Sequence, residues 1–201
     1  MATTLATPQT AESAPRRLTV EEFDRIPEGV FPEGEHIELI EGLIYTKMGQ
    51  NESHITALYA VFAALQEAFG PGFHLGMQVP LKLGTVSKPE PDIIVRRGTW
   101  RDFDGHPPDP TKDVPLIVEI SDTTLADDRG RKTRLYAKHG IPEYWIVSLQ
   151  NRTLEVRRGP RPDSEDYFET FVYREGEAAT INGHSVAVSD LLPKAVAPDQ
   201  D

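Results

Sequence analysis

The chain has 201 residues, a formal net charge of −11 and no cysteine. The lack of cysteine excludes disulfides and thiolate zinc sites, and no run approaches the roughly 20 apolar residues that a membrane-spanning helix needs. The negative charge argues against broad electrostatic attraction to nucleic acid. We therefore expect a single α/β domain with a sizeable core, located in the cytoplasm and without a membrane partner.

Acidic and basic residues are unevenly distributed along the chain. Residues 21–41 contain eight acidic residues and one base, whereas residues 127–138 contain five bases and two acidic residues. A surface that binds phosphate must therefore be local, or must be formed by association of two copies of the chain.

Three parts of the chain differ in composition. Residues 1–17 are mostly small and polar, and they lack the basic start and apolar centre of a signal peptide, so they predict a disordered leader. Residues 18–192 predict one folded domain, because no linker or internal repeat interrupts them. Residues 193–201 predict a polar tail.

The first predicted elements are a short helix and a β-hairpin. Thr19 and Glu22 have the spacing of a capping box, which predicts a helix over residues 19–25. The run "HIELIEGLIYTKM" contains two β-rich segments on either side of Glu41 and Gly42, and it predicts a hairpin that turns at these two residues.

A long helix and two strands follow. Apolar residues recur at helical spacing from Ser53 to Phe69, and Gly70 with Pro71 ends the helix. The alternating run "HLGMQVPLKL" predicts a half-buried strand over residues 74–83, and "PDIIV" predicts a short apolar strand. The polar, proline-rich residues after "PDIIV" predict a loop.

The second half of the chain predicts a crossover unit. "PLIVEIS" is apolar enough for a strand buried on both faces, a helix over residues 127–139 ends at Gly140, and "PEYWIVSL" is the next buried strand. Strand–helix–strand connections of this kind are right-handed and join parallel strands. "TLEVRR" and "YFETFVY" predict an antiparallel continuation, so the expected sheet is mixed.

Two acidic residues do not fit the apolar strands in which they stand. Glu119 lies near the end of the buried run, and burial of an ionised carboxylate costs several kcal/mol unless a side chain, a metal ion or a proton meets it. Asp92 opens "PDIIV", with Glu90 on the same side of an extended segment. The alternatives are that Glu119 lies at a wet strand end and that Pro-Glu-Pro-Asp is an ordinary turn.

Two carboxylates at the polar ends of apolar strands point to a shared cation. If a hairpin or meander brings Asp92 and Glu119 together, their repulsion requires a proton or a cation between them. Oxygen ligands without thiols favour Mg²⁺ or Mn²⁺ over zinc. Lys132, on the next helix, reaches the same carboxylates if the crossover returns it to that end of the sheet, and otherwise belongs to a solvated helix face.

Several segments, in this order along the chain, resemble one family of nucleases. "IELIEG", "PEPDIIV", "VEISDTT" and "DRGRKTRLYAKHGIPEYWIV" are similar to segments of the Uma-type restriction endonucleases, a branch of the PD-(D/E)XK nuclease superfamily. The resemblance covers residues 18–192 and is most specific over residues 115–147. It implies an α/β (α+β) fold with a restriction-endonuclease-like core: a central mixed β-sheet flanked by helices, with an N-terminal hairpin and antiparallel C-terminal strands.

The resemblance also implies roles for particular residues. Asp92 matches the aspartate of the "PD" element and Glu119 the acidic residue of the second element, so both are expected metal ligands, with the backbone carbonyl of Ile120 as a third oxygen. Lys132 matches the catalytic lysine, which in this branch stands on the following helix. Glu38, in "IELIEG", matches an additional acidic residue of the first core element.

Further positions match less closely. Ser121 stands where the superfamily commonly has its lysine, two residues after the second acidic residue. His54 and Gln78 resemble positions near the pocket, and Glu90 and Ser121 are further candidates for its lining. Ser148 replaces the aspartate that relatives have after "YWIV", a change expected to affect a turn rather than the chemistry.

The resemblance implies a Mg²⁺- or Mn²⁺-dependent endonuclease that hydrolyses phosphodiester bonds in DNA. Arg96, Arg97 and Arg101, together with the bases of residues 127–138, are candidates for a phosphate-contacting rim, which a homodimer would extend. Two alternatives stay open: a phosphoesterase that acts on RNA or a small nucleotide, and a non-catalytic nucleic-acid or protein interaction module on the same fold.

Overall fold

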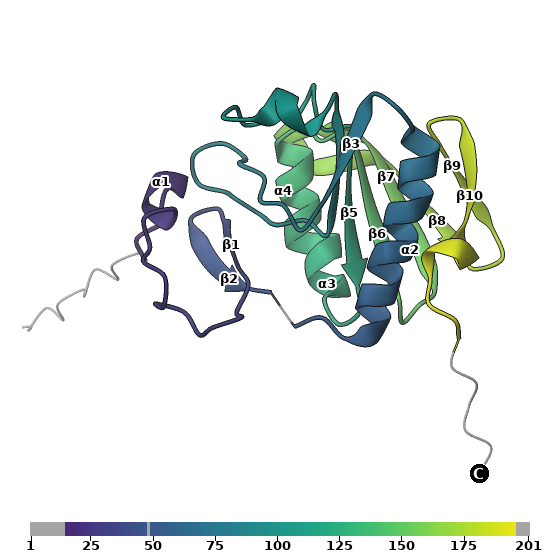
Figure 1. Cartoon of the computed structure of the whole chain (residues 1–201), viewed down its shortest axis with the longest axis horizontal. Coiled ribbons are helices and arrows are strands. Elements are labelled where there is room, and N and C mark those ends of the chain that lie inside the picture. Colours follow the sequence, from purple (N-terminus) through teal and green to yellow (C-terminus); the bar gives the residue numbers. More distant parts are fainter. Residues whose placement is uncertain (1–14, 48, 196–201) are drawn as a thin grey trace, which may run out of the picture.

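The computed structural model describes residues 15–47 and 49–195 (Figure 1). The leader predicted over residues 1–17 lies outside the described residues except for its last three, and only residues 193–195 of the predicted tail are described. At the start of the described chain, the Arg17 guanidinium donates a hydrogen bond to the backbone carbonyl of Glu41.

The first helix begins with the predicted capping box. Helix α1 comprises Val20–Phe23. The backbone N–H of Glu22 donates to Thr19 Oγ1 at 3.2 Å, and the N–H of Thr19 donates to the Glu22 carboxylate at 3.0 Å. Each side chain thus satisfies a backbone donor of the helix end, which confirms the predicted start.

The predicted hairpin follows α1, and it stands beside the main sheet (Figure 1). Strands β1 (Ile37–Ile40) and β2 (Leu43–Thr46) pair antiparallel. The two-residue turn between them holds Glu41 at φ 49° and Gly42 at φ 80°. Two left-handed residues in the turn match the right-handed twist of the strands. Glycine adopts this conformation without steric cost, which explains why it occupies the second position of the turn.

Alanine at position 42 is expected to lower the free energy of unfolding by about 1–3 kcal/mol. A Cβ atom there would lie 2.5 Å from the Cβ of Arg17, and the left-handed backbone disfavours any side chain. Urea denaturation of Gly42→Ala measures this loss. Gly176→Ala is the control, because a Cβ at Gly176 meets no heavy atom within 4 Å. Equal stability of the two variants would contradict the prediction.

A six-stranded mixed sheet forms the centre of the domain (Figure 1). Its strand order is β3-β4-β5-β6-β7-β8, with β5 and β6 parallel and the other neighbouring pairs antiparallel. The parallel pair confirms the predicted crossover, and the β7–β8 pair confirms the antiparallel continuation. The strands are β3 (Phe73–Met77), β4 (Ile93–Arg97), β5 (Leu116–Ser121), β6 (Glu143–Ser148), β7 (Thr153–Arg161) and β8 (Asp166–Arg174).

Helices cover both faces of this sheet. The predicted long helix, α2 (Glu52–Phe69), packs on one face, with Asn51 as its N-cap. The helix predicted over residues 127–139 lies on the other face, begins at Leu125 and contains one turn of π-helix. It ends before Gly140, whose φ of 71° confirms the left-handed cap. Its parts are α3 (Leu125–Asp127), the π turn η2 (Asp128–Lys132) and α4 (Thr133–Lys138).

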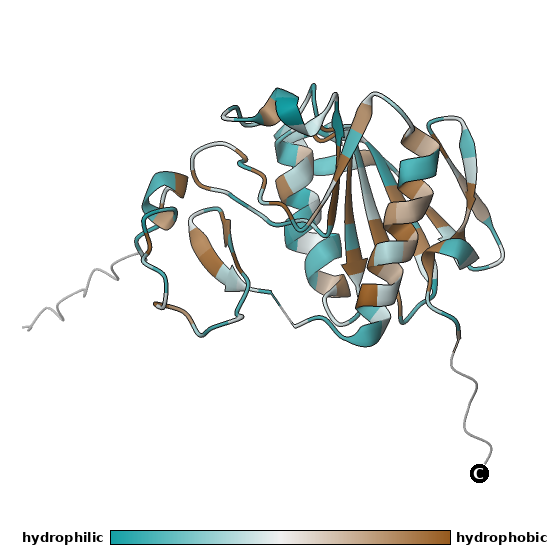
Figure 2. Cartoon of the chain, viewed as in Figure 1, coloured by the Kyte–Doolittle hydropathy of each residue, from teal (hydrophilic) through white to brown (hydrophobic). Residues whose placement is uncertain are grey.

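The core has two apolar layers, one on each side of the sheet. The α2 layer contains Val118 and Trp145, and the α4 layer contains Ile117 and Tyr144. Successive residues of β5 thus enter opposite layers, which explains why all six residues of this strand are buried. Figure 2 shows strands of the sheet largely in brown, the apolar colour, between helices of mixed colour.

Two regions differ from the prediction. The strand expected over residues 74–83 ends at Met77, because Gln78 adopts φ 52° and the nearby Pro80 has no N–H for a strand ladder. A second hairpin, β9 (Ala178–Ile181) with β10 (His184–Ala187), was not predicted. The remaining short helical turns are η1 (Trp100–Phe103), η3 (Pro162–Ser164) and η4 (Val188–Leu191).

Among the described residues, none of the helices combines the length and the hydropathy that crossing a lipid bilayer requires.

Candidate active site

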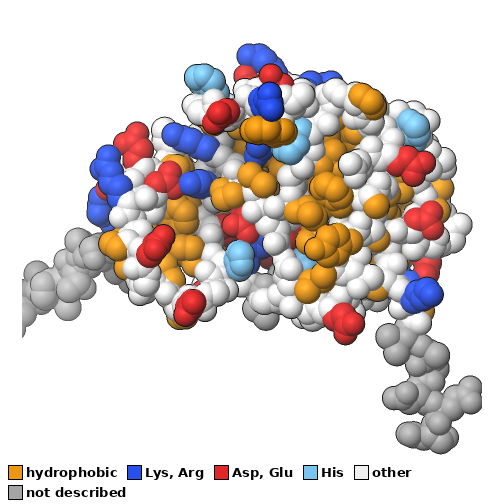
Figure 3. Space-filling model, viewed as in Figure 1, with side chains coloured by type: hydrophobic (Ala, Val, Ile, Leu, Met, Phe, Trp, Pro, Cys, Tyr) orange, Lys and Arg blue, Asp and Glu red, His pale blue; other side chains and the backbone are white. Residues whose placement is uncertain are grey.

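A cavity of about 910 Å³ lies where the N-terminal hairpin faces the main sheet. Its walls come from β1 and β2, the start of α2, the adjacent ends of β4 and β5, and the α3–η2 segment. Figure 3 shows red acidic atoms, with blue and pale-blue basic atoms beside them, in the hollow between the hairpin and the rest of the domain. The residues predicted to be catalytic all line this cavity: Glu38, Asp92, Glu119 and Lys132.

The cavity carries an excess of negative charge. Seven of its lining residues are Asp or Glu and three are Lys or Arg, besides His36 and His54. This excess repels an approaching phosphate group, so a phosphate needs an accompanying cation to bind there.

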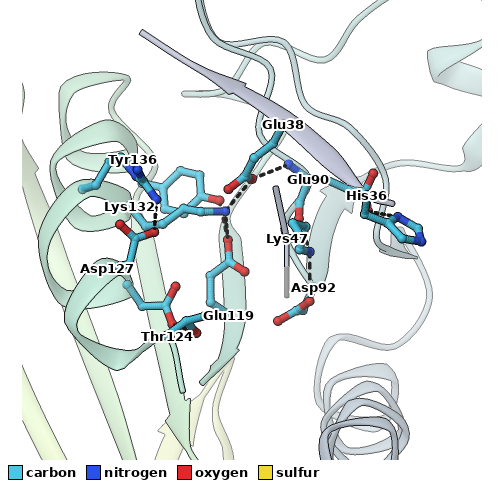
Figure 4. Close-up of polar contacts among 12 residues, drawn as sticks. His36, Glu38, Lys47, Glu90, Asp92, Glu119, Thr124, Asp127, Lys132 and Tyr136 are labelled. Atoms are coloured by element: carbon cyan, nitrogen blue, oxygen red, sulfur yellow. Dashed lines mark hydrogen bonds and ion pairs between the residues drawn. The ribbon is translucent and has the colours of Figure 1, made fainter. Parts of the chain in front are cut away.

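Glu119 contacts an amine and a hydroxyl at the bottom of the cavity (Figure 4). Its Oε1 accepts hydrogen bonds from Lys132 Nζ at 3.1 Å and from the Tyr136 hydroxyl at 2.6 Å. Lys132 Nζ also donates to Glu38 Oε2 at 2.7 Å, so one ammonium bridges carboxylates from β5 and β1. The positive partner that the sequence required for Glu119 is, in this structure, a side chain.

These contacts compensate the charge of Glu119 only in part. Burial raises the pKa of Glu119 to about 7, although the charge of Lys132 acts in the opposite direction. Burial lowers the pKa of Lys132, but the charges of Glu119 and Glu38 outweigh it, so that pKa is raised. Among the described residues, Glu119 Oε2 has no hydrogen-bond partner. Glu119 can therefore interact with a further positive charge through this oxygen.

A turn of π-helix fixes the position of Lys132. At the end of η2, the backbone N–H of Thr133 donates to the carbonyl of Asp128, five residues back. The same carbonyl accepts from Thr133 Oγ1 at 2.8 Å and from the Tyr144 hydroxyl, on β6, at 3.2 Å. The turn is thus tied to the sheet, and π turns are frequent at functional sites.

Asp92 is held by donors from three different elements. Its Oδ2 accepts from the backbone N–H of Ile120 at 2.8 Å and lies 3.3 Å from His54 Nε2, and its Oδ1 accepts from Lys47 Nζ at 3.2 Å. Burial raises the pKa of Asp92, but the hydrogen bond from His54 and the charge of Lys47 outweigh it and lower the pKa to about 2. Asp92 is therefore well compensated, unlike Glu119.

Gln78 and Glu90, two further predicted pocket residues, support the site through their backbones. Gln78 lines the cavity, and its N–H donates to the carbonyl of Asp92 at 3.0 Å. The N–H of Glu90 donates to Glu38 Oε2 at 3.2 Å, and Glu90 Oε1 lies 3.2 Å from His36 Nδ1. The side chain of Glu90 is not among the described residues that line the cavity.

Ser121 has a structural environment. It is fully buried, it is not among the described residues of the cavity wall, and its hydroxyl lies 3.5 Å from that of Thr124. Ser148 is its partner in the β5–β6 ladder, and Ser148 Oγ accepts from the N–H of Asn151 in the turn that follows. The expectation that Ser121 lines the pocket is therefore wrong, and Ser148 acts in a turn as expected.

The predicted phosphate-contacting rim is only partly at the cavity. Arg131 and Lys132 line it, and the Arg131 guanidinium stacks on Tyr45, 3.4 Å from the ring centroid. Strands rise about 3.3 Å per residue, so the far end of β4 lies more than about 10 Å from Asp92. Three arginines lie at or beyond that far end and outside the described cavity wall, which corrects their predicted place: Arg96, Arg97 and Arg101.

Two donors to the predicted carboxylates, Tyr136 and Lys47, were not predicted from the sequence. Tyr136 stands four residues after Lys132, and this spacing places the two side chains next to each other on a helix. The sequence therefore contained the information needed to predict Tyr136. Lys47 follows β2 and reaches Asp92, 45 positions further along the chain. No local pattern marks Lys47, because its role depends on how the hairpin docks on the sheet.

The donor set fits a magnesium ion that keeps part of its water. Within the described ranges, no three acidic or histidine side chains gather closely enough to hold a metal by themselves. Asp92 and Glu119 are facing positions of the β4–β5 pair, since Ile93 pairs with Val118. The N–H of Ile120 faces Asp92, so its carbonyl, on the same edge of the strand, faces it too. Mg²⁺ commonly takes one or two carboxylates and completes its shell with waters and substrate phosphates.

Comparison with known families agrees with this architecture. The profile of the Uma2 family, described as "Putative restriction endonuclease", matches residues 20–189. The chain belongs to this family. The Uma2 match runs from α1 into η4, so the cavity and both of its ion clusters lie within it, and the resemblance read from the sequence is confirmed.

The Uma2 chain also has a similar solved structure. It is the crystal structure of a protein from Anabaena variabilis described as "a putative nuclease belonging to DUF820", with a TM-score of 0.64 and 19 % sequence identity. The similarity covers 87 % of this chain and 97 % of that one, and at this identity it shows the fold alone. The expected α/β core with a central mixed sheet is thereby confirmed. A search among curated proteins finds no match.

Proposed function

We propose that this Uma2 protein is a metal-dependent endonuclease that hydrolyses phosphodiester bonds in DNA with Mg²⁺ or Mn²⁺. The observation that carries the proposal is the convergence of Glu38, Asp92, Glu119 and Lys132 on one cavity with excess acidic side chains. Buried acidic residues in excess destabilise a fold unless a cation joins them. Their presence therefore favours a catalytic role over a purely structural one.

In this mechanism Asp92, Glu119 and the carbonyl of Ile120 would hold the ion, which would supply polarisation of the scissile phosphate and activation of a water molecule. Lys132 would donate a hydrogen bond to the attacking water or to the phosphate oxygen that gains charge. Glu38 acts through Lys132: its carboxylate accepts from the ammonium at 2.7 Å and so directs the amine into the cavity.

The choice of DNA as substrate rests on the family, whose description is that of a restriction endonuclease. Arg131, stacked on Tyr45 at the cavity wall, is the base best placed to contact the nucleic-acid backbone. A homodimer, which would extend this contact surface, and a location in the cytoplasm stay predictions.

Cleavage assays with defined ions and substrates test the proposal. The purified protein is expected to cut plasmid DNA with Mg²⁺ or Mn²⁺ and not with EDTA. Asp92→Asn and Glu119→Gln are each expected to reduce the rate by about a thousandfold or more, because each removes a ligand of the ion. Asp163→Asn, a change of an exposed acidic residue in η3, is the matched control and should cut at the wild-type rate.

The other outcomes separate the alternatives. An unchanged rate in Asp92→Asn or Glu119→Gln would remove that residue from the mechanism. Cleavage of RNA or of small phosphodiesters without cleavage of DNA would show that the substrate is not DNA, but the proposed active site would stand. Failure to cleave any of these substrates would favour the non-catalytic interaction module.

A further inference from the structure

We propose that Lys47 is a further positioning residue of this site: it holds Asp92 until a metal ion binds, and then turns its ammonium to the substrate phosphate. The second half of this inference rests on the proposed nuclease function. The first half concerns only Lys47 and Asp92, and it can be tested without any substrate.

Asp92 has one carboxylate oxygen to offer an incoming ion. Oδ2 accepts from the N–H of Ile120 at 2.8 Å and lies 3.3 Å from His54 Nε2. These two donors belong to β5 and α2, which are packed into the core and hold their positions. Oδ1 has a single partner among the described residues, Lys47 Nζ at 3.2 Å. An ion that binds Asp92 through Oδ1 therefore meets the Lys47 ammonium at the same oxygen.

Of the two lysines in the cavity, Lys47 is the one free to move. Its side chain is 16 % exposed, it lines the cavity, and its other partner is a neutral acceptor, the carbonyl of Glu90 at 2.7 Å. The side chain of Lys132 is 4 % exposed and is bound to two carboxylates. A lysine stem has four flexible carbons, so rotation alone can carry the Lys47 amine into the cavity.

Two positive charges at one carboxylate oxygen repel each other, and a phosphate relieves the repulsion. Metal binding therefore displaces Lys47 from Asp92, and a phosphodiester that binds beside the ion provides the anion to which the freed ammonium turns. By linkage, an exchange of this kind makes metal binding and substrate binding favour each other. Lys47 thus suppresses metal binding in the empty site and strengthens phosphate binding in the loaded one.

Calorimetric titration with Mg²⁺ or Mn²⁺ in the absence of DNA tests the first half. Lys47→Met is expected to bind the ion about tenfold more tightly than wild type, because the competing ammonium is gone. Lys47→Arg keeps the charge and should bind like wild type. Lys82→Met, a change of an exposed lysine, is the matched control. Lys47→Gln repeats the test with a polar side chain, should the methionine variant fold poorly.

Cleavage kinetics test the second half. In Lys47→Met the KM for DNA is expected to rise about tenfold, with a smaller change in kcat, because a phosphate contact is lost. An unchanged KM would overturn the phosphate role. If Lys47→Met and Lys47→Gln bind the metal ion no more tightly than wild type, then Lys47 does not compete with the ion for Asp92. This result would overturn the first half of the proposal even if the protein cleaves DNA. Tighter metal binding in these variants with no cleavage by wild type would sustain the first half and refute the nuclease function.

Discussion

Replacement of Lys132 by methionine is expected to lower the free energy of unfolding by about 3–5 kcal/mol, because it removes one side of a buried ion cluster. Without the ammonium, Glu38 and Glu119 lose donors at 2.7 and 3.1 Å, and the neutral donors that they keep, the N–H of Glu90 and the Tyr136 hydroxyl, do not replace its positive charge. Cleavage is expected to fall by about a hundredfold to a thousandfold, the usual loss for one transition-state donor. Metal binding should persist, because Asp92 and Glu119 are still present.

Urea denaturation and cleavage rates measure the two effects, with Lys138→Met as the matched control. Lys138 lies in the same helical run and is 41 % exposed, and its ion pairs with Glu41 and Glu165 are both at the surface. Its loss should cost about 1 kcal/mol or less. Equal stability of Lys132→Met and Lys138→Met would show that the buried carboxylates do not need the amine.

A double variant separates the structural role of Lys132 from its catalytic role. Glu38→Gln removes one of the two carboxylates left without compensation, so adding it to Lys132→Met should restore part of the lost stability. Cleavage should stay low, since the donor to the reacting groups is still missing. Recovery of cleavage together with stability would mean that Lys132 acts only by holding the fold.

Local patterns predicted the parts of the fold that depend on neighbouring residues. The capping box at Thr19 and the turn at Gly42 were correct, because each is set by the geometry of a few consecutive residues. The parallel pair β5–β6 was correct, because a helix between two apolar strands allows few other arrangements. The strand after Phe73 was overextended, because alternation continued past Gln78, where the backbone turns left-handed and leaves the ladder.

The contacts within the site could be predicted where they join elements that are consecutive in the chain or paired in the sheet. Glu119 lies near the end of β5 and Lys132 lies in the helical crossover that follows this strand, so their contact at 3.1 Å follows from the crossover. Asp92 joins them because β4 is the antiparallel neighbour of β5. Lys47 could not be predicted, because its contact with Asp92 depends on how a separate hairpin docks on the sheet.

Asp92→Asn and Glu119→Gln are expected to change the stability of the metal-free protein in opposite directions at about pH 8. The pKa of Asp92 is about 2, below its usual 3.8, because its three donors outweigh burial, so asparagine should cost about 2 kcal/mol. The pKa of Glu119 is about 7, above its usual 4.5, because burial disfavours its charge. Glutamine removes that charge and keeps an oxygen that can accept from Tyr136, so this variant should be more stable than wild type at pH 8.

The dependence on pH distinguishes the two carboxylates. The stabilisation from Asp92 is fully present above pH 3.8 and is lost as the pH falls towards 2. The stabilisation from protonated Glu119 is fully present below pH 4.5 and is lost as the pH rises through 7. Across this range the free energy of unfolding of wild type should fall by about 3 kcal/mol. Urea denaturation in EDTA between about pH 4 and 8 should show Glu119→Gln gaining this amount relative to wild type, while the deficit of Asp92→Asn stays nearly constant. A constant difference for Glu119→Gln as well would mean that Lys132 already compensates Glu119 fully, and that the site has no unmet demand for a cation.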